Sequence, residues 1–134
     1  MTDRELIQFA IRARDRAYAP YSDFRVGAAL LGKSGTVYTG CNVENASFSA
    51  TLCAERAALS KAVCEGEREF AAIAIVGGKC NALSPICPPC GVCRQVLAEF
   101  CAPDFRVIIG TPDHTRSISL SELLPLSFDA TALN

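Results

Sequence analysis

The sequence has no apolar run near the roughly 20 residues that a membrane-spanning helix needs. It also has no excess of basic residues, with 13 Lys and Arg against 14 Asp and Glu and a formal net charge of -1. Nucleic-acid binders usually carry a basic patch. Here the basic residues are scattered singly, and those with helical spacing fit a solvated helix face better: Arg4, Arg12, Arg14, Arg16 and Arg25. We therefore expect neither a nucleic-acid partner nor a membrane partner.

A secretory signal is missing from the N-terminal segment MTDRELIQFA, which lacks a basic stretch followed by an apolar one. We therefore expect a cytoplasmic protein. Histidine is also scarce. The single one, His114, lies in a polar turn, and we assign it no metal-binding role. Cysteine is abundant, with eight residues. In a reducing compartment, metal binding explains such an abundance better than disulfides do.

The cysteines divide into a cluster and a dispersed set. Four of them fall within 14 residues of one another: Cys80, Cys87, Cys90 and Cys93. Of the dispersed ones, Cys41, Cys64 and Cys101 lie on or beside apolar segments, and we expect them to be small core residues.

Hydrophobic patterns predict a single α/β domain over residues 1–134. Thr2 and Glu5 form a capping box that begins the first helix. The continuous apolar run at 70–76 is typical of a strand buried on both faces. The predicted order is helix 2–17, strands 25–31 and 36–41, helix 53–64, strand 70–76, helix 91–101, strands 105–109 and 115–119, and helix 121–124. The opening hairpin is antiparallel and the later crossovers are parallel, which gives a mixed sheet between helices.

Two motifs carry the chemistry, Cys53-Ala54-Glu55 and the segment 89–93 (PCGVC). Each begins a predicted helix, where the partial positive charge favours thiolate over thiol. Three thiolates from Cys53, Cys90 and Cys93 leave the fourth tetrahedral position of zinc open, as in catalytic zinc sites. Zinc lowers the pKa of a bound water to about 7, and Glu55 lies close enough to move its proton. The pattern predicts a zinc-dependent hydrolase.

The chain resembles the small cytidine deaminase family along nearly its whole length. The matching segments are 17–22 (AYAPYS), 42–45 (NVEN), 53–56 (CAER), 89–96 (PCGVCRQV) and 123–125 (LLP). The resemblance implies a three-layer α/β/α sandwich with a mixed five-stranded sheet. It also implies one Zn²⁺ per subunit in a homotetramer. The implied reaction, part of pyrimidine salvage, is hydrolytic deamination of cytidine and 2′-deoxycytidine to uridine and 2′-deoxyuridine with release of ammonia.

The same resemblance assigns roles to individual residues. Glu55 is the proton carrier, and Arg56 offsets the charge of the ligand sulfurs. Substrate binding falls to Phe24, Asn42, Glu44 and Ala54. Phe48 and Phe128 match positions that approach a neighbouring subunit's site. Position 48 is often Tyr in the family, so a contact that needs its hydroxyl is lost here.

Other interpretations of the same motifs stay open. A deaminase of another aminopyrimidine nucleoside, such as blasticidin S, shares both cysteine motifs, although the segment 42–45 favours a free ribose. Cys80, Cys87, Cys90 and Cys93 could instead form a closed structural zinc site in a binding module. The spacing from Cys87 to Cys93 also matches the start of an iron–sulfur motif, but its continuation is missing. In the main interpretation Cys87 is a spectator near the metal.

Overall fold

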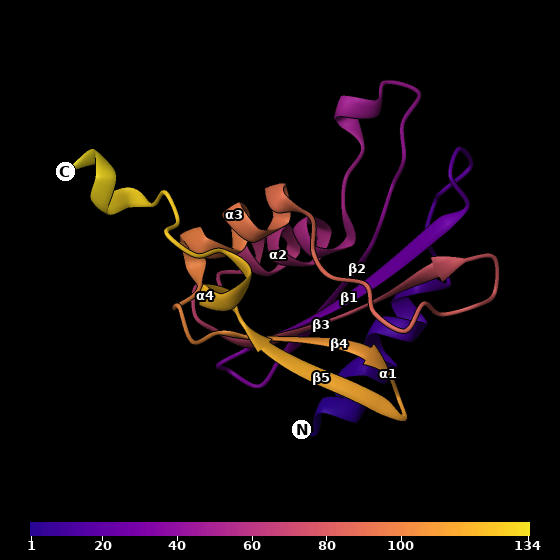
Figure 1. Ribbon diagram of the computed structural model, residues 1–134, viewed down its shortest axis with the longest axis horizontal. Helices are drawn as coiled ribbons and strands as arrows, with labels where there is room; N and C mark the ends of the chain where they lie inside the picture. Colours follow the sequence, from indigo (N-terminus) through magenta and orange to yellow (C-terminus); the bar gives the residue numbers. More distant parts are fainter.

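The computed structural model describes all of residues 1–134. Along the chain, single strands and pairs of strands are separated by helices (Figure 1). Two short 3₁₀ helices, Phe48–Ala50 and Ala130–Leu133, lie outside the main elements. No helix combines the length and the apolar character required to cross a membrane. The elements are α1 (Asp3–Arg14), β1 (Phe24–Gly32), β2 (Val37–Cys41), α2 (Ala54–Cys64), β3 (Phe70–Lys79), α3 (Gly91–Phe100), β4 (Arg106–Thr111), β5 (His114–Ser119) and α4 (Leu120–Leu123).

The five strands form one mixed sheet in the order β2-β1-β3-β4-β5. β1 is antiparallel to both β2 and β3, β3 is parallel to β4, and β4 is antiparallel to β5. The two helical crossovers, through α2 and through α3, therefore each join parallel strands. This arrangement confirms the predicted mixed five-stranded sheet.

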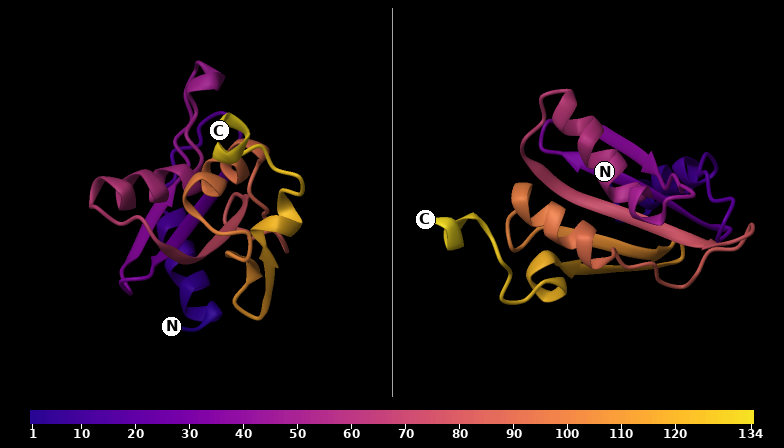
Figure 2. Two further views of the ribbon diagram at one scale, coloured as in Figure 1. Left: turned by 90° about the vertical axis from the view of Figure 1, so that its left-hand side faces the viewer. Right: turned by 90° about the horizontal axis from the view of Figure 1, so that it is seen from above.

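Helices cover both faces of the sheet. α1 lies on one face, and α2 and α3 lie side by side on the other, with α4 beside α3 (Figure 2). Each face has its own apolar core. The α1 side contains Leu6, Ile7, Ala10, Ala29, Ala72, Ala74, Val76 and Ile108. The larger core under α2 and α3 includes Leu30, Leu59, Ile73, Ile75, Leu97, Val107 and Ile109. The structure is thus the three-layer α/β/α sandwich that the resemblance implied.

Two glycines allow the helices to lie directly on the sheet. A Cβ atom at Gly40 of β2 would lie 2.6 Å from both the Ala54 carbonyl oxygen and the Ala58 nitrogen of α2. A Cβ atom at Gly27 of β1 would lie 2.0 Å from the Ala10 carbonyl oxygen of α1. Real Cβ atoms do not approach backbone so closely. These positions therefore set the distance of α1 and of the start of α2 from the sheet.

The first helix ends earlier than predicted. α1 ends at Arg14 rather than near residue 17, although its capping box between Thr2 and Glu5 is present. Beyond it the Tyr18 nitrogen donates to the Asn42 carbonyl, and the Tyr18 carbonyl accepts from the Glu44 nitrogen. This strand-like pairing draws residues 15–18 out of the helix. Helical periodicity along the sequence carries no sign of it.

Two expectations about single side chains are wrong. Arg14, predicted on a solvated face, is buried, and Cys64, predicted in the core, is exposed. Cys64 is the last residue of α2, just before the turn that leads to β3. Cys41 and Cys101 are partly buried.

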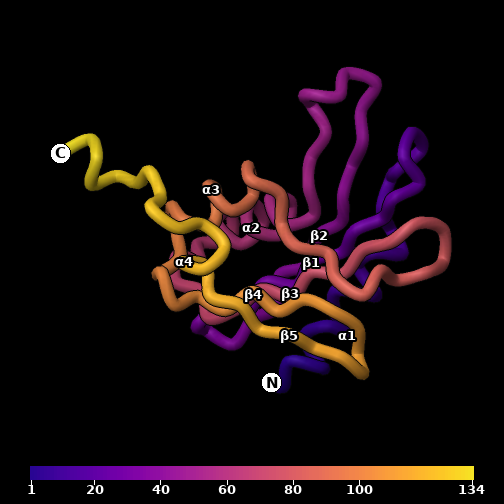
Figure 3. The backbone as a smooth tube through the Cα atoms, viewed as in Figure 1, coloured from indigo at the N-terminus to yellow at the C-terminus, as the bar shows by residue number.

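Two segments project from the layers. Residues 42–52, between β2 and α2, form a long excursion that contains the first 3₁₀ helix, and the chain after α4 extends away from the sheet (Figure 3).

Candidate metal centre

Three cysteine sulfurs meet where α2 and α3 begin. Cys53 is the N-cap residue of α2, Cys90 is the N-cap residue of α3, and Cys93 lies in the first turn of α3. The sulfur atoms of all three lie within 4.8 Å of one another. Cys53 Sγ is 3.8 Å from Cys90 Sγ, which is 3.6 Å from Cys93 Sγ. The structure therefore brings together the three predicted ligands.

The sulfur spacing fits zinc. Sulfurs bound tetrahedrally at about 2.3 Å from zinc are about 3.8 Å apart, close to the spacings seen here. Three thiolates also form a soft donor set of the kind that zinc prefers. Two helix N-termini direct partial positive charge at the place where the sulfurs meet. These three cysteines are thus suited to hold a zinc ion with one position left for a non-protein ligand.

Arg56 supplies positive charge to the sulfurs. Its Nη2 donates to Cys53 Sγ at 3.4 Å and to the Thr51 carbonyl at 3.3 Å. Hydrogen bonds from Cys93 and Arg56 lower the pKa of the Cys53 thiol to about 5. Arg56 Nε is buried with no acceptor of its own, so the guanidinium has capacity for a second thiolate.

Glu55 lies beside this cluster without belonging to it. Its side chain is 4% exposed, in the first turn of α2. Burial raises the pKa of its carboxyl to about 7, and the negative charge of Cys53 adds to the increase. A carboxyl with a pKa near neutrality can both accept and donate a proton.

A cavity of about 190 Å³ is lined by Cys53, Cys90 and Glu55. Four predicted site residues besides the cysteines line it: Phe24, Asn42, Ala54 and Glu55. Four further lining residues were not singled out from the sequence as substrate-facing: Val26, Thr51, Cys87 and Pro88. Cys87 was expected near the metal as a spectator, and it lies in the cavity wall. Nothing in the local sequence marks the other three, because their place at the cavity depends on the course of β1, of the excursion at 42–52 and of the loop before α3.

The two residues assigned to the ribose are held differently. Asn42 is buried, with its Oδ1 accepting from the Val26 nitrogen and its Nδ2 donating to the Phe24 carbonyl, each at 2.8 Å. Glu44 lines an adjoining hollow of about 400 Å³ that shares Thr51 with the cavity. Its carboxylate accepts from the Tyr21 nitrogen at 2.9 Å and from the Ser22 hydroxyl. These bonds lower the Glu44 pKa, the Ser22 hydroxyl contributing most.

The two aromatic residues expected to reach a neighbour do not enter this chain's cavity. Phe48 is 75% exposed on the excursion at 42–52 and makes an edge contact with Tyr21. Phe128 is 64% exposed in the C-terminal segment, where its carbonyl accepts a hydrogen bond from Gln95 of α3. Both side chains are thus largely exposed, and Phe48 also lines the hollow that contains Glu44.

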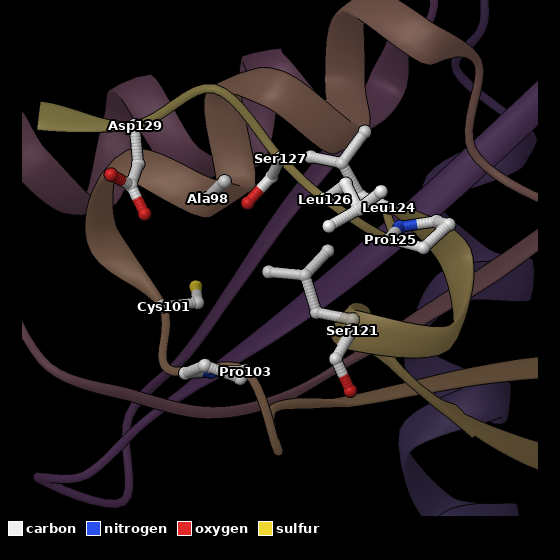
Figure 4. A pocket seen from close by; sticks show the side chains of 10 residues that line it. Ala98, Cys101, Pro103, Ser121, Leu124, Pro125, Leu126, Ser127 and Asp129 are labelled. Carbon is white, nitrogen blue, oxygen red and sulfur yellow. The ribbon is translucent and has the colours of Figure 1, made fainter. Parts of the chain in front are cut away.

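A separate hollow of about 400 Å³ lies between the C-terminal end of α3 and the chain around α4 (Figure 4). Its polar side chains are those of Ser121, Ser127 and Asp129, beside Cys101. None of the three clustered cysteines, Cys53, Cys90 and Cys93, lines it.

The two other cysteines of the 80–93 cluster, Cys80 and Cys87, do not supply a fourth ligand for zinc. Cys80 is exposed, and its Sγ donates to Asp23 Oδ2 at 3.0 Å. Cys87 is buried in the cavity wall, where desolvation raises the pKa of its thiol to about 11. Only Cys53, Cys90 and Cys93 form a metal-binding group, which contradicts the closed four-cysteine site.

The fold and the site together define a zinc-binding α/β domain of the catalytic kind. A family model described as the cytidine and deoxycytidylate deaminase zinc-binding region matches residues 1–111. A cytidine deaminase of Halalkalibacterium halodurans is 52% identical over 134 residues, covering 98% of each chain. One from Sporosarcina psychrophila is 44% identical, covering 100% of this chain and 96% of its own.

A comparison with solved structures also finds cytidine deaminases. The crystal structure of cytidine deaminase from Burkholderia pseudomallei superposes with a TM-score of 0.88 at 47% identity, covering 96% of this chain and 100% of its own. The chain belongs to the cytidine deaminase family.

Proposed function

We propose that this chain hydrolyses cytidine and 2′-deoxycytidine to uridine and 2′-deoxyuridine, releasing ammonia. The observation that carries the proposal is the buried Glu55 carboxyl beside three sulfurs that fit zinc, at the wall of a small cavity. Zinc-dependent nucleobase deaminases combine these same parts. Residues 1–134 would act as one catalytic domain.

The chemistry divides between the metal and Glu55. When bound, zinc supplies water activation, lowering the pKa of a water to about 7. The Glu55 carboxylate accepts a proton from the attacking water and delivers it to the ring nitrogen next to the amine-bearing carbon. The water oxygen bonds to that carbon. Glu55 then carries the second proton to the amine, which leaves as ammonia while the carbonyl forms.

Arg56 and the substrate residues support this step. Three thiolates on divalent zinc leave a net charge of -1, and the Arg56 guanidinium at Cys53 offsets it. Phe24 packs on the base, and Ala54 at the start of α2 borders it. Asn42 and Glu44 bind the ribose hydroxyls, with Asn42 keeping one N–H and one lone pair beyond its bonds to β1.

We further propose a cytoplasmic homotetramer that serves pyrimidine salvage. A reducing compartment keeps the ligand thiols available for zinc. Phe48 and Phe128 are large aromatic side chains exposed on segments that project from the subunit, and each would contact a neighbour's site.

The proposal is tested by following the ultraviolet absorbance of cytidine with the purified zinc-loaded protein. Absorbance should fall as uridine forms, with one ammonia per uridine, and a zinc chelator should stop the change. Cytosine without sugar and blasticidin S serve as competing substrates. A higher kcat/KM for cytosine would contradict the ribose assignment, and a higher kcat/KM for blasticidin S would favour the other deaminase class.

A contact test uses Glu44→Ala. This variant should raise KM for cytidine at least tenfold, about 1.4 kcal/mol, while zinc content stays at one per chain. An unchanged KM would remove Glu44 from the ribose site.

A further inference from the structure

Arg14 is a buried cation that the proposed reaction does not use. It lies in the last turn of α1 with 6% of its surface exposed. Its Nε donates to the Arg25 carbonyl of β1 at 3.0 Å. Its Nη2 lies 2.8 Å from each of the carbonyl oxygens of Gly78, Cys80 and Ala82.

No carboxylate pairs with this guanidinium, since the ion pairs of the chain involve Arg4, Arg25 and Arg106. Burying an unpaired cation is costly unless hydrogen bonds satisfy it. Here backbone carbonyl oxygens take the place of a counter-ion. The guanidinium in turn supplies N–H donors to the Cys80 and Ala82 carbonyls, to which no backbone N–H donates. Both belong to the turn at residues 78–82, which begins in the last two residues of β3.

That turn opens the connection that delivers a zinc ligand. Residues 80–90 contain no helix or strand, and they end at Cys90, the N-cap residue of α3. Figure 1 shows this connection passing the C-terminal end of α1. Its backbone bonds are few: Cys80 nitrogen to the Asp23 carbonyl at 3.4 Å, Ala82 nitrogen to the Lys79 carbonyl at 3.1 Å and Ser84 nitrogen to the Gly77 carbonyl at 2.7 Å. Pro85, Pro88 and Pro89 have no N–H to donate.

The connection is therefore anchored by side chains at its two ends. Arg14 holds the end next to β3, and Arg94 holds the other, its Nε donating to the Pro89 carbonyl at 2.8 Å. Cys80 has a left-handed backbone, with φ at 54°, a conformation that persists only when surrounding contacts impose it. Between the anchors run Cys87 and Pro88, which line the cavity.

We propose that Arg14 is a positioning residue for the metal site, a role that rests on the proposed function. Its hydrogen bonds to three carbonyls of the 78–82 turn fix the start of the proline-stiffened connection. The position of that start in turn fixes where Cys90 lies relative to Cys53. It also fixes the cavity wall at Cys87 and Pro88. Arg14 contacts neither zinc nor substrate.

The test compares zinc release from holoenzyme variants to a chromophoric chelator, alongside the melting temperature and the kinetic constants for cytidine. Arg14→Met should release zinc about tenfold faster and lower kcat about tenfold, as loss of a supporting shell does. Arg14→Lys should fall between, because an ammonium keeps the charge but not the fork that spans several carbonyls.

Leu6→Ala is the matched control, since it opens a cavity in the α1 core without touching the turn. It should lower the melting temperature at least as much while zinc release stays within about twofold of the wild-type rate. Gly78→Ala disturbs the turn without changing Arg14, because the added Cβ would lie 2.1 Å from the Ala82 carbonyl oxygen. It should speed zinc release as Arg14→Met does.

Wild-type zinc release from Arg14→Met would overturn the proposal, and so would equally fast release from Leu6→Ala. If Arg14→Met does not fold, Arg14→Lys and Gly78→Ala decide by the same comparison. Zinc release needs no turnover. A wild-type protein that binds zinc but leaves cytidine unchanged would therefore defeat the proposed function and leave this comparison intact.

Discussion

One helical turn carries three different tasks in consecutive or nearly consecutive residues. Cys53 is the N-cap residue and offers a sulfur, Glu55 lies buried in the first turn, and Arg56 donates a hydrogen bond to the Cys53 sulfur. The environments separate the roles. Hydrogen bonds lower the pKa of Cys53, whereas desolvation raises that of Glu55. The thiol is thus ready to ionise, and the carboxyl stays near the point where it can exchange protons.

Glu55→Gln tests the proton-carrying role. The amide keeps the shape of the side chain but cannot accept a proton, so kcat should fall by about 10²- to 10⁴-fold. Zinc content and melting temperature serve as controls and should match those of the wild-type protein. Turnover within a few-fold of the wild-type value would rule out Glu55 as the base.

Arg56→Ala tests the charge-offsetting role. Without the guanidinium at Cys53, the three thiolates donate more negative charge to the metal and make its water less acidic. We expect kcat to fall by about 10- to 100-fold, with a smaller change in KM. Steady-state kinetics on fully zinc-loaded protein measure both. A change in KM alone would place Arg56 in substrate binding instead.

The sequence indicated the chemistry of single residues better than their surroundings. Cys53, Cys90 and Cys93 were recognisable because their motifs mark helix starts. Arg14 was misjudged because helical spacing cannot show that the partners of its side chain come from a loop 64 to 68 residues further along. The bonds of Asn42 to β1 were equally hidden, since they depend on the start of β1 lying beside the end of β2.

At the scale of elements, the helix beginnings and the ends of α2, α3 and α4 lie within one residue of the prediction, whereas α1 ends three residues earlier than predicted. The Thr2–Glu5 capping box is local and begins α1 as expected, whereas the pairing of Tyr18 with the 42–44 segment shortens that helix. A second capping box, Ser119 with Glu122, begins α4 one residue before the predicted start. β3 runs to Lys79 because its last residues pair with Phe24 and Arg25 of β1.

Gly40→Val tests whether close packing of α2 on β2 sets the position of the zinc ligands. The added side chain must push the start of α2 away from the sheet, because a Cβ atom there already meets the backbone of Ala54 and Ala58. We expect a loss of about 1–3 kcal/mol in the free energy of unfolding, together with weaker zinc binding. Denaturant unfolding and metal titration measure the two effects.

Ser60→Ala on the exposed side of α2 is the control and should change neither quantity. If Gly40→Val kept wild-type zinc affinity while losing stability, the packing of α2 would not determine the site.

At the scale of the whole molecule, the layers place the site at one end of the sheet and leave two segments projecting. The layers followed from the pattern of apolar strands between helices, because each strand and helix face must be buried. The course of the excursion at 42–52 and of the C-terminal segment did not, since neither packs into the cores.

The proposed tetramer predicts that Phe128 acts on a neighbour's site. Phe128→Ala should raise KM for cytidine several-fold while each subunit keeps its zinc. Sedimentation of the wild-type protein should give four times the chain mass of 14.3 kDa. A fully active monomer would contradict both the assembly and the role of Phe128. Phe48→Ala, on the other projecting segment, should likewise raise KM for cytidine without loss of zinc.

The central claim is that Cys53, Cys90 and Cys93 hold one zinc ion beside Glu55. Its most direct test is the zinc content of purified Cys53→Ala, with Cys80→Ala as the control. Removing one of three ligands should leave Cys53→Ala with little or no zinc, whereas Cys80→Ala should keep one zinc per chain. Full zinc in Cys53→Ala together with its loss from Cys80→Ala would place the metal in the 80–93 cluster and contradict the account.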